Sequence, residues 1–271
     1  MKFLEGKPVA ENIKKDFASR IENVKVKPNI AVLGMKGDGA SNIYIKNIKK
    51  NCEQYNIGFN LILVDSAKEF ENEFNKIKVD ENITGIMFQQ PLNETLISLI
   101  NELPSNKDVE GIGINNIGKL FLGKEDAMIP CTSKAIVELI DYYGIDLEGK
   151  KVVIVGRSNI VGKPLIPQIL KRNATVTICH SKTRNLSEET KNADVVIMAI
   201  GKANFLKKEM IKKDAILIDV GINFLNGKLC GDIDYEDVKE YAKAITPVPG
   251  GIGVVTNAVF IDNIIKAVEY Y

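Results

Sequence analysis

The chain has 271 residues, 45% hydrophobic and 26% charged, which suits a globular protein of about two domains. Its 36 lysines and arginines nearly balance its 35 aspartates and glutamates, and this balance argues against nucleic acid or an anionic membrane as a partner. No apolar run approaches the roughly 20 residues that span a bilayer, and the first residues lack the apolar core of a signal peptide. A soluble, cytoplasmic protein is therefore expected.

The sequence offers few ligands for a metal ion. It contains one histidine, His180, which excludes sites built from several histidines. Its four cysteines lie far apart and form no Cys-x-x-Cys pair, so we expect them to be reduced and mostly buried. No metal site is predicted.

Short apolar runs alternate with helical periodicity in the first half of the chain. Strands are predicted at residues 30–33, 59–64 and 85–88, and helices at about 41–55 and 68–77. Each predicted strand leads into a polar or glycine-rich loop, which is where open α/β sheets bind ligands. The loop 34–39 lacks the Gly-Lys-Ser/Thr ending of a P-loop, and we interpret it as a strand-to-helix turn.

The second half repeats this alternation more regularly. Thr132 or Ser133 is expected to cap a helix that Gly144 ends. Near-continuous apolar runs predict buried parallel strands at 152–155, 175–179, 195–200 and 216–220. The remaining segments are interpreted as a polar, turn-rich stretch at 228–240, a rigid connector at 246–251 and an amphipathic helix at 257–270. The whole pattern predicts a largely parallel α/β fold.

The strand at 152–155 leads directly into Gly156-Arg157-Ser158 and then Gly162. Dinucleotides are bound by this arrangement, in which a strand is followed by a glycine turn and then by a helix with proline in its first turn. The reason is that the free N–H groups and the positive dipole end of the helix attract the pyrophosphate. The spacing is Gly-x-Ser-x-x-x-Gly instead of Gly-x-Gly-x-x-Gly, so a turn that only packs the helix onto the sheet remains an alternative.

The segment after the next strand distinguishes two cofactors. NAD-dependent enzymes commonly carry an acidic residue there, which binds the ribose hydroxyls. Residues 180–184 contain no acid, and their hydroxyls and cations, together with Arg157, suit the 2′-phosphate of NADP. We therefore predict NADP as the cofactor and interpret His180 as a structural residue.

Ten segments of the chain form one set of motifs: 4–10 (LEGKPVA), 41–44 (SNIY), 88–92 (FQQPL), 107–111 (KDVEG), 130–132 (PCT), 156–164 (GRSNIVGKP), 179–183 (CHSKT), 218–223 (IDVGIN), 231–234 (GDID) and 246–253 (TPVPGGIG). Through them the chain resembles the bifunctional methylenetetrahydrofolate dehydrogenase/methenyltetrahydrofolate cyclohydrolase family. The resemblance implies an N-terminal α/β folate domain (1–120 plus 256–271) and a C-terminal Rossmann-type NADP-binding domain (121–255). It further implies that the C-terminal helix packs back on the first domain, that the substrate is a tetrahydrofolate one-carbon compound, and that the protein is a homodimer.

The resemblance also implies roles for individual residues. The expected catalytic residues are Tyr44, Gln89 and Glu110. The expected folate-binding residues are Tyr44, Gln89, Pro91, Glu110, Pro249, Gly250 and Gly251. The expected dinucleotide contacts are Gly156, Arg157, Ser158, Ser181 and Ile222. The family has aspartate where this chain has Glu110, so the pterin contact reaches one methylene further.

One departure from the family bears on the reaction. The family carries a lysine one helical turn after the tyrosine, where this chain has Ile48. Tyr44 and Ile48 project in the same direction from a helix, whereas Lys46, Lys49 and Lys50 point elsewhere. Hydride transfer needs mainly placement of the two partners, but hydrolysis of the methenyl product needs proton movement that lysine supports. The sequence thus predicts an NADP-dependent methylenetetrahydrofolate dehydrogenase whose cyclohydrolase activity is weak or absent.

Three alternatives stay open at this point. The first is the fully bifunctional enzyme, which makes 10-formyltetrahydrofolate. The second is an inactive dinucleotide-binding module, against which the retention of Tyr44, Gln89 and a carboxylate at Glu110 argues. The third is another Rossmann dehydrogenase, which would need a histidine or lysine base that the sequence does not offer.

Overall fold

The computed structural model describes residues 1–37, 42–90 and 92–269, and the side chains of residues 42–44 lie outside this description. Two compact units are present: Met1–Asn12 with Pro130–Thr256, and Ile13–Ile129 with Asn257–Tyr271. Helices α1 (Gly6–Ile21) and α10 (Ile252–Glu269) contribute residues to both units. Most of the C-terminal helix therefore belongs with Ile13–Ile129, which form most of the N-terminal half of the chain, as the resemblance implied. The domain limits expected at residues 120 and 255 stay a prediction.

A six-stranded parallel sheet forms the centre of the first unit. Its strand order is β1–β11–β8–β7–β5–β6. The strands are β1 (Lys2–Phe3), β5 (Lys151–Val155), β6 (Thr175–Cys179), β7 (Val195–Met198), β8 (Ile216–Asp219) and β11 (Ala244–Ile245). Since β6 follows β5 on one side and β7 lies on the other, the chain changes direction across the sheet at β5. The carboxyl ends of β5 and β7 thus mark the switch point at which such sheets bind ligands.

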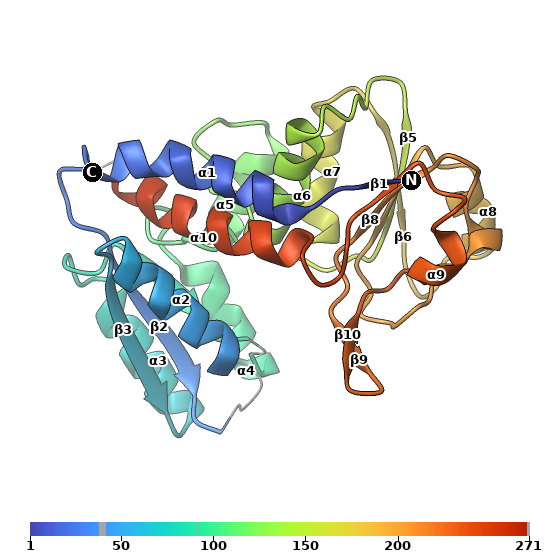
Figure 1. The fold of residues 1–271 in the computed structure, drawn as a ribbon. Helices are drawn as coiled ribbons and strands as arrows, with labels where there is room; N and C mark the ends of the chain where they lie inside the picture. Colours follow the sequence, from blue (N-terminus) through green and yellow to red (C-terminus); the bar gives the residue numbers. More distant parts are fainter. Residues whose placement is uncertain (38–41, 91, 270–271) are drawn as a thin grey trace. The chain divides into compact units, whose positions relative to one another are not determined.

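Helices cover both faces of this sheet (Figure 1). Helices α6 (Cys131–Tyr142) and α7 (Gly162–Leu170) lie on one face, and α8 (Leu186–Lys191) and α9 (Tyr235–Val238) lie on the other. The burial of β5, β7 and β8 explains their near-continuous apolar sequences. The 3₁₀ turn η3 (Lys208–Met210) lies between β7 and β8 in the chain.

A two-stranded hairpin follows β8 and projects from the first unit (Figure 1). It consists of β9 (Asn223–Leu225) and β10 (Lys228–Cys230), which pair antiparallel. Asn226 and Gly227 form its turn with φ of 51° and 75°. Two consecutive positive φ values are what a two-residue type I′ hairpin turn requires, and Asn-Gly is the pair that adopts them at the lowest cost.

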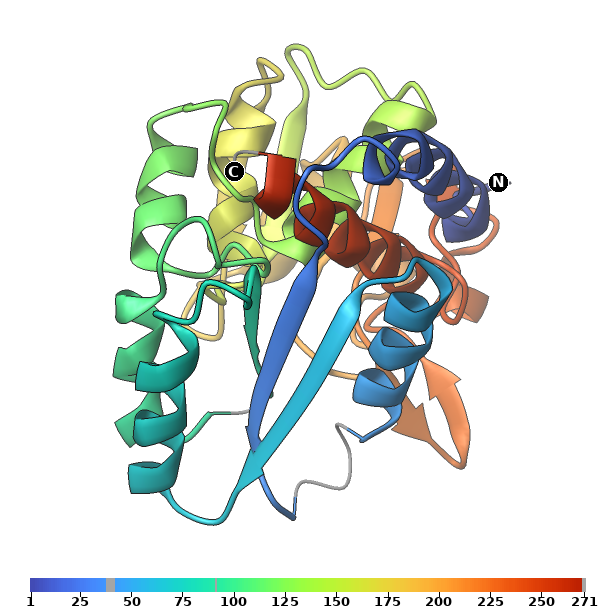
Figure 2. The same ribbon diagram turned by 90° about the vertical axis from the view of Figure 1, so that its left-hand side faces the viewer.

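The second unit contains a three-stranded parallel sheet in the order β3–β2–β4. Its strands are β2 (Asn29–Met35), β3 (Gly58–Val64) and β4 (Gly85–Phe88). Figure 2 shows α2 (Asn42–Gln54) on one face, and α3 (Ala67–Ile77) and α4 (Glu94–Ile97) on the other. Phe70 and Phe74 of α3 pack against Phe88 at ring-centroid distances of 5.4 and 5.2 Å. The 3₁₀ helix η2 (Ser98–Glu102) and α5 (Ile114–Phe121) complete this unit.

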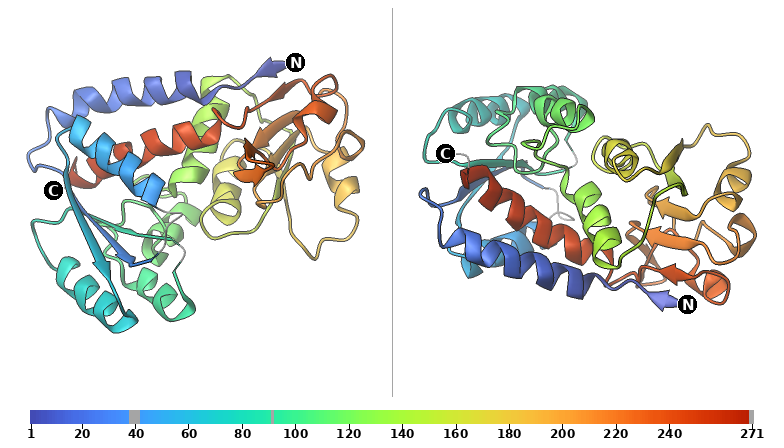
Figure 3. Two further views of the ribbon diagram at one scale, coloured as in Figure 1. Left: turned by 60° about the horizontal axis from the view of Figure 1, so that its bottom comes forward. Right: turned by 90° about the horizontal axis from the view of Figure 1, so that it is seen from above.

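Helices α1 and α10 run side by side and in the same direction (Figure 3). Near their carboxyl ends Arg20 contacts Asp262 and Glu269, with N–O distances of 2.7 Å to each. Helix α10 was expected to be amphipathic and to begin at residue 257. That expectation is wrong, because the helix begins at Ile252 and its residues are buried on nearly all sides. A helix without a solvated face carries little amphipathic signal.

The strands predicted in both halves of the chain are present, and the errors concern ends and short elements. Helix α6 begins at Cys131 with Pro130 at its N-cap, so neither Thr132 nor Ser133 is the cap. Ser133 instead donates its hydroxyl to the carbonyl oxygen of Pro130 (2.9 Å). The stretch 228–240 was interpreted as turns but contains β10 and α9. In the loop expected at 34–39, Gly34 is part of β2, and residues 38 and 39 lie outside the described residues.

Candidate dinucleotide pocket and folate-side residues

Gly156 ends β5 at the switch point and makes the sharp turn toward α7. Its φ is 129°, a backbone conformation that side chains rarely adopt. A Cβ at this position would lie 2.2 Å from the carbonyl oxygen of Ala199, at the end of the neighbouring strand. Gly162 is equally constrained, since a Cβ there would lie 1.9 Å from the carbonyl oxygen of Gly156. The two glycines thus allow the helix to start directly against the strand end.

Ser158 shapes the turn between these glycines. Its hydroxyl accepts a hydrogen bond from the N–H of Val161 (3.1 Å), and its carbonyl oxygen accepts one from the N–H of Lys163 (3.1 Å). Pro164 lies in the first turn of α7, where its missing N–H has no helical partner to lose. The serine of the Gly-x-Ser motif therefore has a turn-forming role that is visible in the structure.

A pocket opens at the carboxyl ends of β5, β6 and β7. Three of the five expected dinucleotide contacts line it: Gly156, Arg157 and Ser181. Ser158 and Ile222 are not among its lining residues, and Ile222 is 63% exposed. The other residues that line the pocket are Val155, His180, Leu186, Ala199, Ile200, Lys202 and Phe205.

The polar side chains of this pocket are cationic or neutral. Arg157 and Lys202 carry positive charge, Ser181 offers a hydroxyl, and no carboxylate is among the lining residues. The imidazole Nδ1 of His180 accepts a hydrogen bond from the backbone N–H of Lys182 (3.1 Å), and the backbone N–H of His180 donates to Thr183 Oγ1 (2.8 Å). These bonds give His180 a role in shaping the β6 loop. Lys202 was missed by sequence reasoning: it lies four residues after the end of β7, whereas Ser181 lies two residues after the end of β6.

In the second unit, Gln89 follows β4 and is only 4% exposed. Its N–H donates to the carbonyl oxygen of Leu33 in β2 (2.8 Å), which extends the strand pairing by one step. Its side chain lies against Gly34, where a Cβ would come within 2.1 Å of Gln89 Oε1 and 2.8 Å of its Cβ. Gly34 is therefore the residue that leaves room for the Gln89 side chain.

Glu110 lies beside Gln89 because its carboxylate accepts the N–H of Phe88 (3.2 Å). Burial raises the pKa of Glu110 to about 8, and the nearby charge of Asp108 contributes in the same direction. Asp108 is fully buried and accepts N–H groups of Ile112 (3.1 Å) and Gly113 (2.8 Å). The turn that presents Glu110 is thus built around a second, structural carboxylate.

Helix α2 places Ile48 in the apolar interior. Ile48 is 2% exposed and shares the buried helix face with Ile45 and Cys52. The three nearby lysines, Lys46, Lys49 and Lys50, are exposed. Lys49 lies 3.9 Å from Glu53, one turn along the same exposed side. Ile48 and the three lysines thus lie on different sides of α2, as the sequence predicted. That Ile48 projects in the same direction as Tyr44 stays a prediction, because the side chain of Tyr44 lies outside the described residues.

Only some of the other expected folate-binding residues are among the described residues. The side chain of Tyr44 and the whole of Pro91 lie outside the described residues. Pro249, Gly250 and Gly251 belong to the first unit, whereas Gln89 and Glu110 belong to the second. The carbonyl oxygen of Gly250 accepts the N–H of Gly6 (2.8 Å), which fixes this loop to the start of α1.

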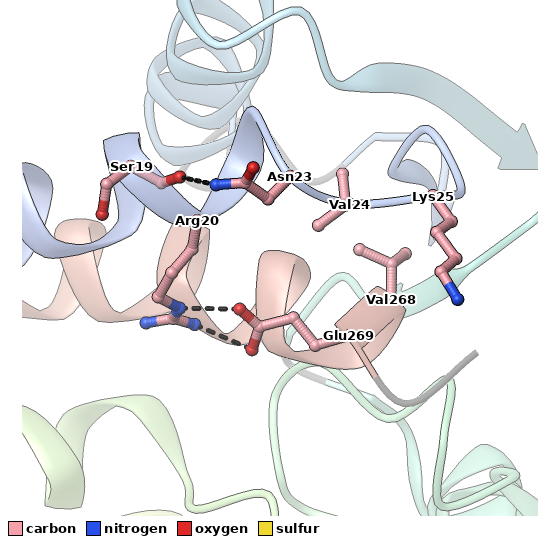
Figure 4. A pocket seen from close by; sticks show the side chains of 7 residues that line it. All are labelled: Ser19, Arg20, Asn23, Val24, Lys25, Val268 and Glu269. Atoms are coloured by element: carbon pink, nitrogen blue, oxygen red, sulfur yellow. Dashed lines mark hydrogen bonds and ion pairs between the residues drawn. The ribbon is translucent and has the colours of Figure 1, made fainter.

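A separate pocket in the second unit lies between the ends of α1 and α10, and Figure 4 shows the side chains that line it. Arg20 donates from Nε and Nη2 to both carboxylate oxygens of Glu269 (2.7 and 3.1 Å). Asn23 donates to the carbonyl oxygen of Ser19 (2.8 Å). Arg20 and Glu269 pair with each other, so we assign this pair the structural task of joining the two helix ends.

Two further findings concern residues 1–37, 42–90 and 92–269. They contain no group of three or more histidine, cysteine, aspartate or glutamate side chains that could hold a metal ion. No helix among them is long and apolar enough to cross a membrane. No disulfide joins the four cysteines, of which Cys52, Cys131 and Cys179 are buried and Cys230 is partly buried.

The parallel sheet, the glycine turn at its switch point and the pocket beside it define the first unit as a Rossmann-type dinucleotide-binding unit. Two family models match the chain. They are the tetrahydrofolate dehydrogenase/cyclohydrolase catalytic domain, at residues 4–110, and the NAD(P)-binding domain of the same family, at residues 130–271. The chain belongs to the tetrahydrofolate dehydrogenase/cyclohydrolase family.

Individual proteins agree with this assignment. The bifunctional protein FolD of Dictyoglomus thermophilum is 44% identical, over 98% of this chain and 96% of its own length. The crystal structure of the bifunctional FolD of Campylobacter jejuni has a TM-score of 0.95 and 36% identity, and covers 100% of this chain and 99% of that one. The Trypanosoma brucei dehydrogenase-cyclohydrolase, solved with NADP and an inhibitor, has a TM-score of 0.90 and 26% identity, and covers 99% and 97%.

Proposed function

We propose that this enzyme oxidises 5,10-methylenetetrahydrofolate to 5,10-methenyltetrahydrofolate with NADP, and that it hydrolyses the methenyl product weakly or not at all. The family supplies the reaction class. The observation that carries the finer proposal is the burial of Ile48 at the position where the family has a lysine. The proposal keeps the first activity of the family and removes the second.

The choice of NADP is supported by the charges of the pocket. Arg157, Lys202 and Ser181 line it without a carboxylate, so a 2′-phosphate would meet cations and a hydroxyl. An NAD-specific pocket would instead hold a carboxylate on the ribose hydroxyls. The Trypanosoma brucei relative was solved with NADP. We assign the dinucleotide contacts to Gly156, Arg157, Ser158, Ser181 and Ile222.

The folate-side assignments rest on Gln89 and Glu110. When bound, the nicotinamide supplies the hydride acceptor, so the protein has to place the folate carbon and exclude water. We assign Gln89 to the reacting one-carbon centre and Glu110 to the pterin ring. The pKa of about 8 at Glu110 means that its carboxyl group carries a proton at neutral pH and can both donate and accept. The other residues that we assign to folate binding are Tyr44, Pro91, Pro249, Gly250 and Gly251.

Loss of hydrolysis follows from what isoleucine cannot do. Hydrolysis of the methenyl group requires that a water be activated and that protons move, and an amine with an adjustable pKa supports both steps. Ile48 has no titratable group, and Lys46, Lys49 and Lys50 are exposed on other sides of α2. Oxidation of the methylene carbon needs no such group, so the dehydrogenase is expected to remain.

The second candidate is the fully bifunctional enzyme, which is favoured by the names of its relatives in Dictyoglomus and Campylobacter. One assay separates the two. The purified enzyme is given methylenetetrahydrofolate with NADP or NAD, and the reduced cofactor and the methenyl product are followed separately. We expect reduced NADP with an equal amount of methenyl product that disappears only at its spontaneous rate. Enzyme-dependent loss of added methenyltetrahydrofolate would overturn the proposal in favour of bifunctionality, and no reduction of either cofactor would leave an inactive dinucleotide-binding module.

Ile48→Lys tests the reason for the loss. We expect this variant to hydrolyse methenyltetrahydrofolate at least about tenfold faster than the wild-type chain, since general acid–base groups contribute roughly 10²–10⁴-fold. Ile48→Met is the matched control, because it keeps an apolar side chain of similar volume at the same helix position. Equal hydrolysis by the lysine and methionine variants would show that this position does not decide the activity.

The homodimer stays a proposal that derives from the family resemblance. Sedimentation equilibrium of the purified chain at micromolar concentration tests it directly. A mass of about twice the 30.0 kDa of one chain is expected. A mass of one chain across the concentration range would overturn it.

A further inference from the structure

Asp232 follows β10 and is completely buried in the first unit. Its carboxylate accepts three consecutive backbone N–H groups. Oδ2 accepts those of Ile200 (2.7 Å) and Gly201 (3.0 Å), and Oδ1 accepts that of Lys202 (2.7 Å). Oδ1 also accepts the side-chain amide of Asn223 (3.0 Å). Four donors on one buried carboxylate satisfy its charge and fix the loop that follows β7.

The backbone of the same residue holds the other end of this loop. The carbonyl oxygen of Asp232 accepts the N–H groups of Phe205 (2.6 Å) and Leu206 (2.9 Å). Three residues that line the dinucleotide pocket, Ile200, Lys202 and Phe205, therefore donate their backbone N–H groups to Asp232. Asp232 itself is not among the lining residues of the pocket.

We propose that Asp232 is a positioning residue for the dinucleotide: it sets one wall of the cofactor pocket, and with it the place of the Lys202 cation. This inference rests on the proposed function, namely that the pocket binds NADP. The loop from 200 to 206 has its own short turns, but the bonds at both of its ends go to one residue. These bonds tie the part of the pocket lining that Ile200, Lys202 and Phe205 form to Asp232.

Two neighbouring features support this role. Asp219, at the end of β8, accepts the N–H of Asp232 (2.9 Å) and holds it in place from behind. The Asp232 carboxylate leaves no room for a side chain at position 221, because a Cβ on Gly221 would lie 2.2 Å from Asp232 Oδ1. The φ of Gly221 is not in the left-handed region, so an alanine at this position acts by contact and not through backbone strain. Its Cβ would press on the Asp232 carboxylate and would lie 2.7 Å from the backbone nitrogen of the same residue.

Only a carboxylate can accept all of these donors. An asparagine at position 232 would keep one of the two side-chain oxygens. The other would be replaced by an NH₂ group, which faces N–H donors and cannot accept their hydrogen bonds. In either orientation of the amide, two donors lose their acceptor. Asp232→Asn therefore removes two of the four hydrogen bonds that the side chain accepts, while it hardly changes the size of the side chain.

The test is dinucleotide affinity, measured on the full chain by NADPH fluorescence and by NADP calorimetry. We expect Asp232→Asn to raise the dissociation constant at least about tenfold. At saturating dinucleotide, its KM for the folate substrate should stay within about twofold. The matched control is Asp108→Asn, which removes a buried carboxylate with three donors, Ile112, Gly113 and Asn116, from the second unit. Both variants should melt earlier, but the control should keep wild-type dinucleotide affinity.

Each outcome decides something different. A wild-type chain that binds neither NADP nor NADPH overturns the proposed function and this inference with it. Wild-type affinity in a folded Asp232→Asn variant overturns only the positioning role and leaves the proposed function standing. If Asp232→Asn does not fold, Gly221→Ala takes its place, with an expected loss of affinity of roughly threefold or more. Its control is Gly118→Ala, where a Cβ meets nothing within 4 Å, and unchanged affinity in Gly221→Ala would also overturn the inference.

Discussion

The candidate dinucleotide pocket of the first unit and the proposed folate-binding residues of the second are built from different parts of the chain. In the first unit the shape of the pocket is set by backbone: Gly156 turns the chain, and Asp232 holds three loop N–H groups in place. In the second unit the candidate chemistry lies in the side chains of Gln89 and Glu110. Among the described residues, the Glu110 carboxylate accepts one hydrogen bond, from the N–H of Phe88.

This difference teaches where substitutions should act. A fixed backbone loses affinity when its geometry changes, even if no contacting side chain is altered. A side-chain site instead responds to the space around a side chain and to its protonation. We therefore expect substitutions in the first unit to change dinucleotide binding, and those in the second to change turnover and pH dependence.

The largest effect is expected for Gly156→Ala. An alanine would need a φ near 129° and would place its Cβ 2.2 Å from the carbonyl oxygen of Ala199, so the turn must move. We expect the dissociation constant for NADP to rise by about a hundredfold, as measured by calorimetry. Gly149→Ala is the control in the same unit, because Gly149 has φ of 68° and open space. It should cost roughly 1 kcal/mol of stability and leave affinity unchanged, and equal effects would break the comparison.

A smaller effect is expected for Arg157→Gln. The guanidinium is exposed at the pocket, and loss of a charge-assisted hydrogen bond to a phosphate weakens binding by roughly 10- to 30-fold. NADP affinity should fall by this factor, while NAD affinity stays within about twofold. Parallel titrations with the two dinucleotides measure the ratio. An equal loss for both would mean that Arg157 does not contact the 2′-phosphate.

Gly34→Ala tests the side-chain site. Its Cβ would lie 2.1 Å from Gln89 Oε1, so the glutamine must move away from its present position. We expect kcat of the dehydrogenase to fall by roughly tenfold, with the dissociation constant for NADP unchanged. Gly118→Ala, which meets open space on α5, should leave both quantities unchanged. A selective loss of NADP affinity in Gly34→Ala would contradict the separation of the two regions.

Glu110→Gln is expected to act on stability and not on dinucleotide affinity, and its effect appears as a pH dependence. The pKa of Glu110 is raised from 4.5 to about 8, so the folded state binds more protons than the unfolded state between these values. Its contribution therefore lowers the free energy of unfolding as pH rises from about 4.5 to 8. The glutamine variant lacks this titration, so its stability relative to wild type should increase across that window, by on the order of 1–3 kcal/mol. Denaturant unfolding at several pH values measures the difference, and a flat difference would contradict the raised pKa.

Much of the first unit could be predicted from the sequence. The apolar runs at β5, β7 and β8 are continuous because both sheet faces are covered there, and this local property survives in any parallel sheet. The edge strand β6 was also expected to be buried, but it alternates threonine with apolar residues and is only partly buried. The glycine turn was visible for the same reason: Gly156 has to be glycine whatever surrounds it. The β9–β10 hairpin was missed although its Asn226-Gly227 turn is a strong local signal.

The contacts between distant segments were decided by the tertiary structure alone. Asp232 lies about 30 residues from the loop that it holds, as the separation of its bonds shows, and neither its type nor its spacing reveals that task. The same holds for Gly34 beside Gln89, and for the carboxylate of Glu110, whose raised pKa depends on burial. The sequence by itself determined the fold class, the family and the phase of Ile48, because these follow from periodicity and motif. The positions and protonation of the site residues depend on packing between segments far apart in the chain, which no local pattern encodes.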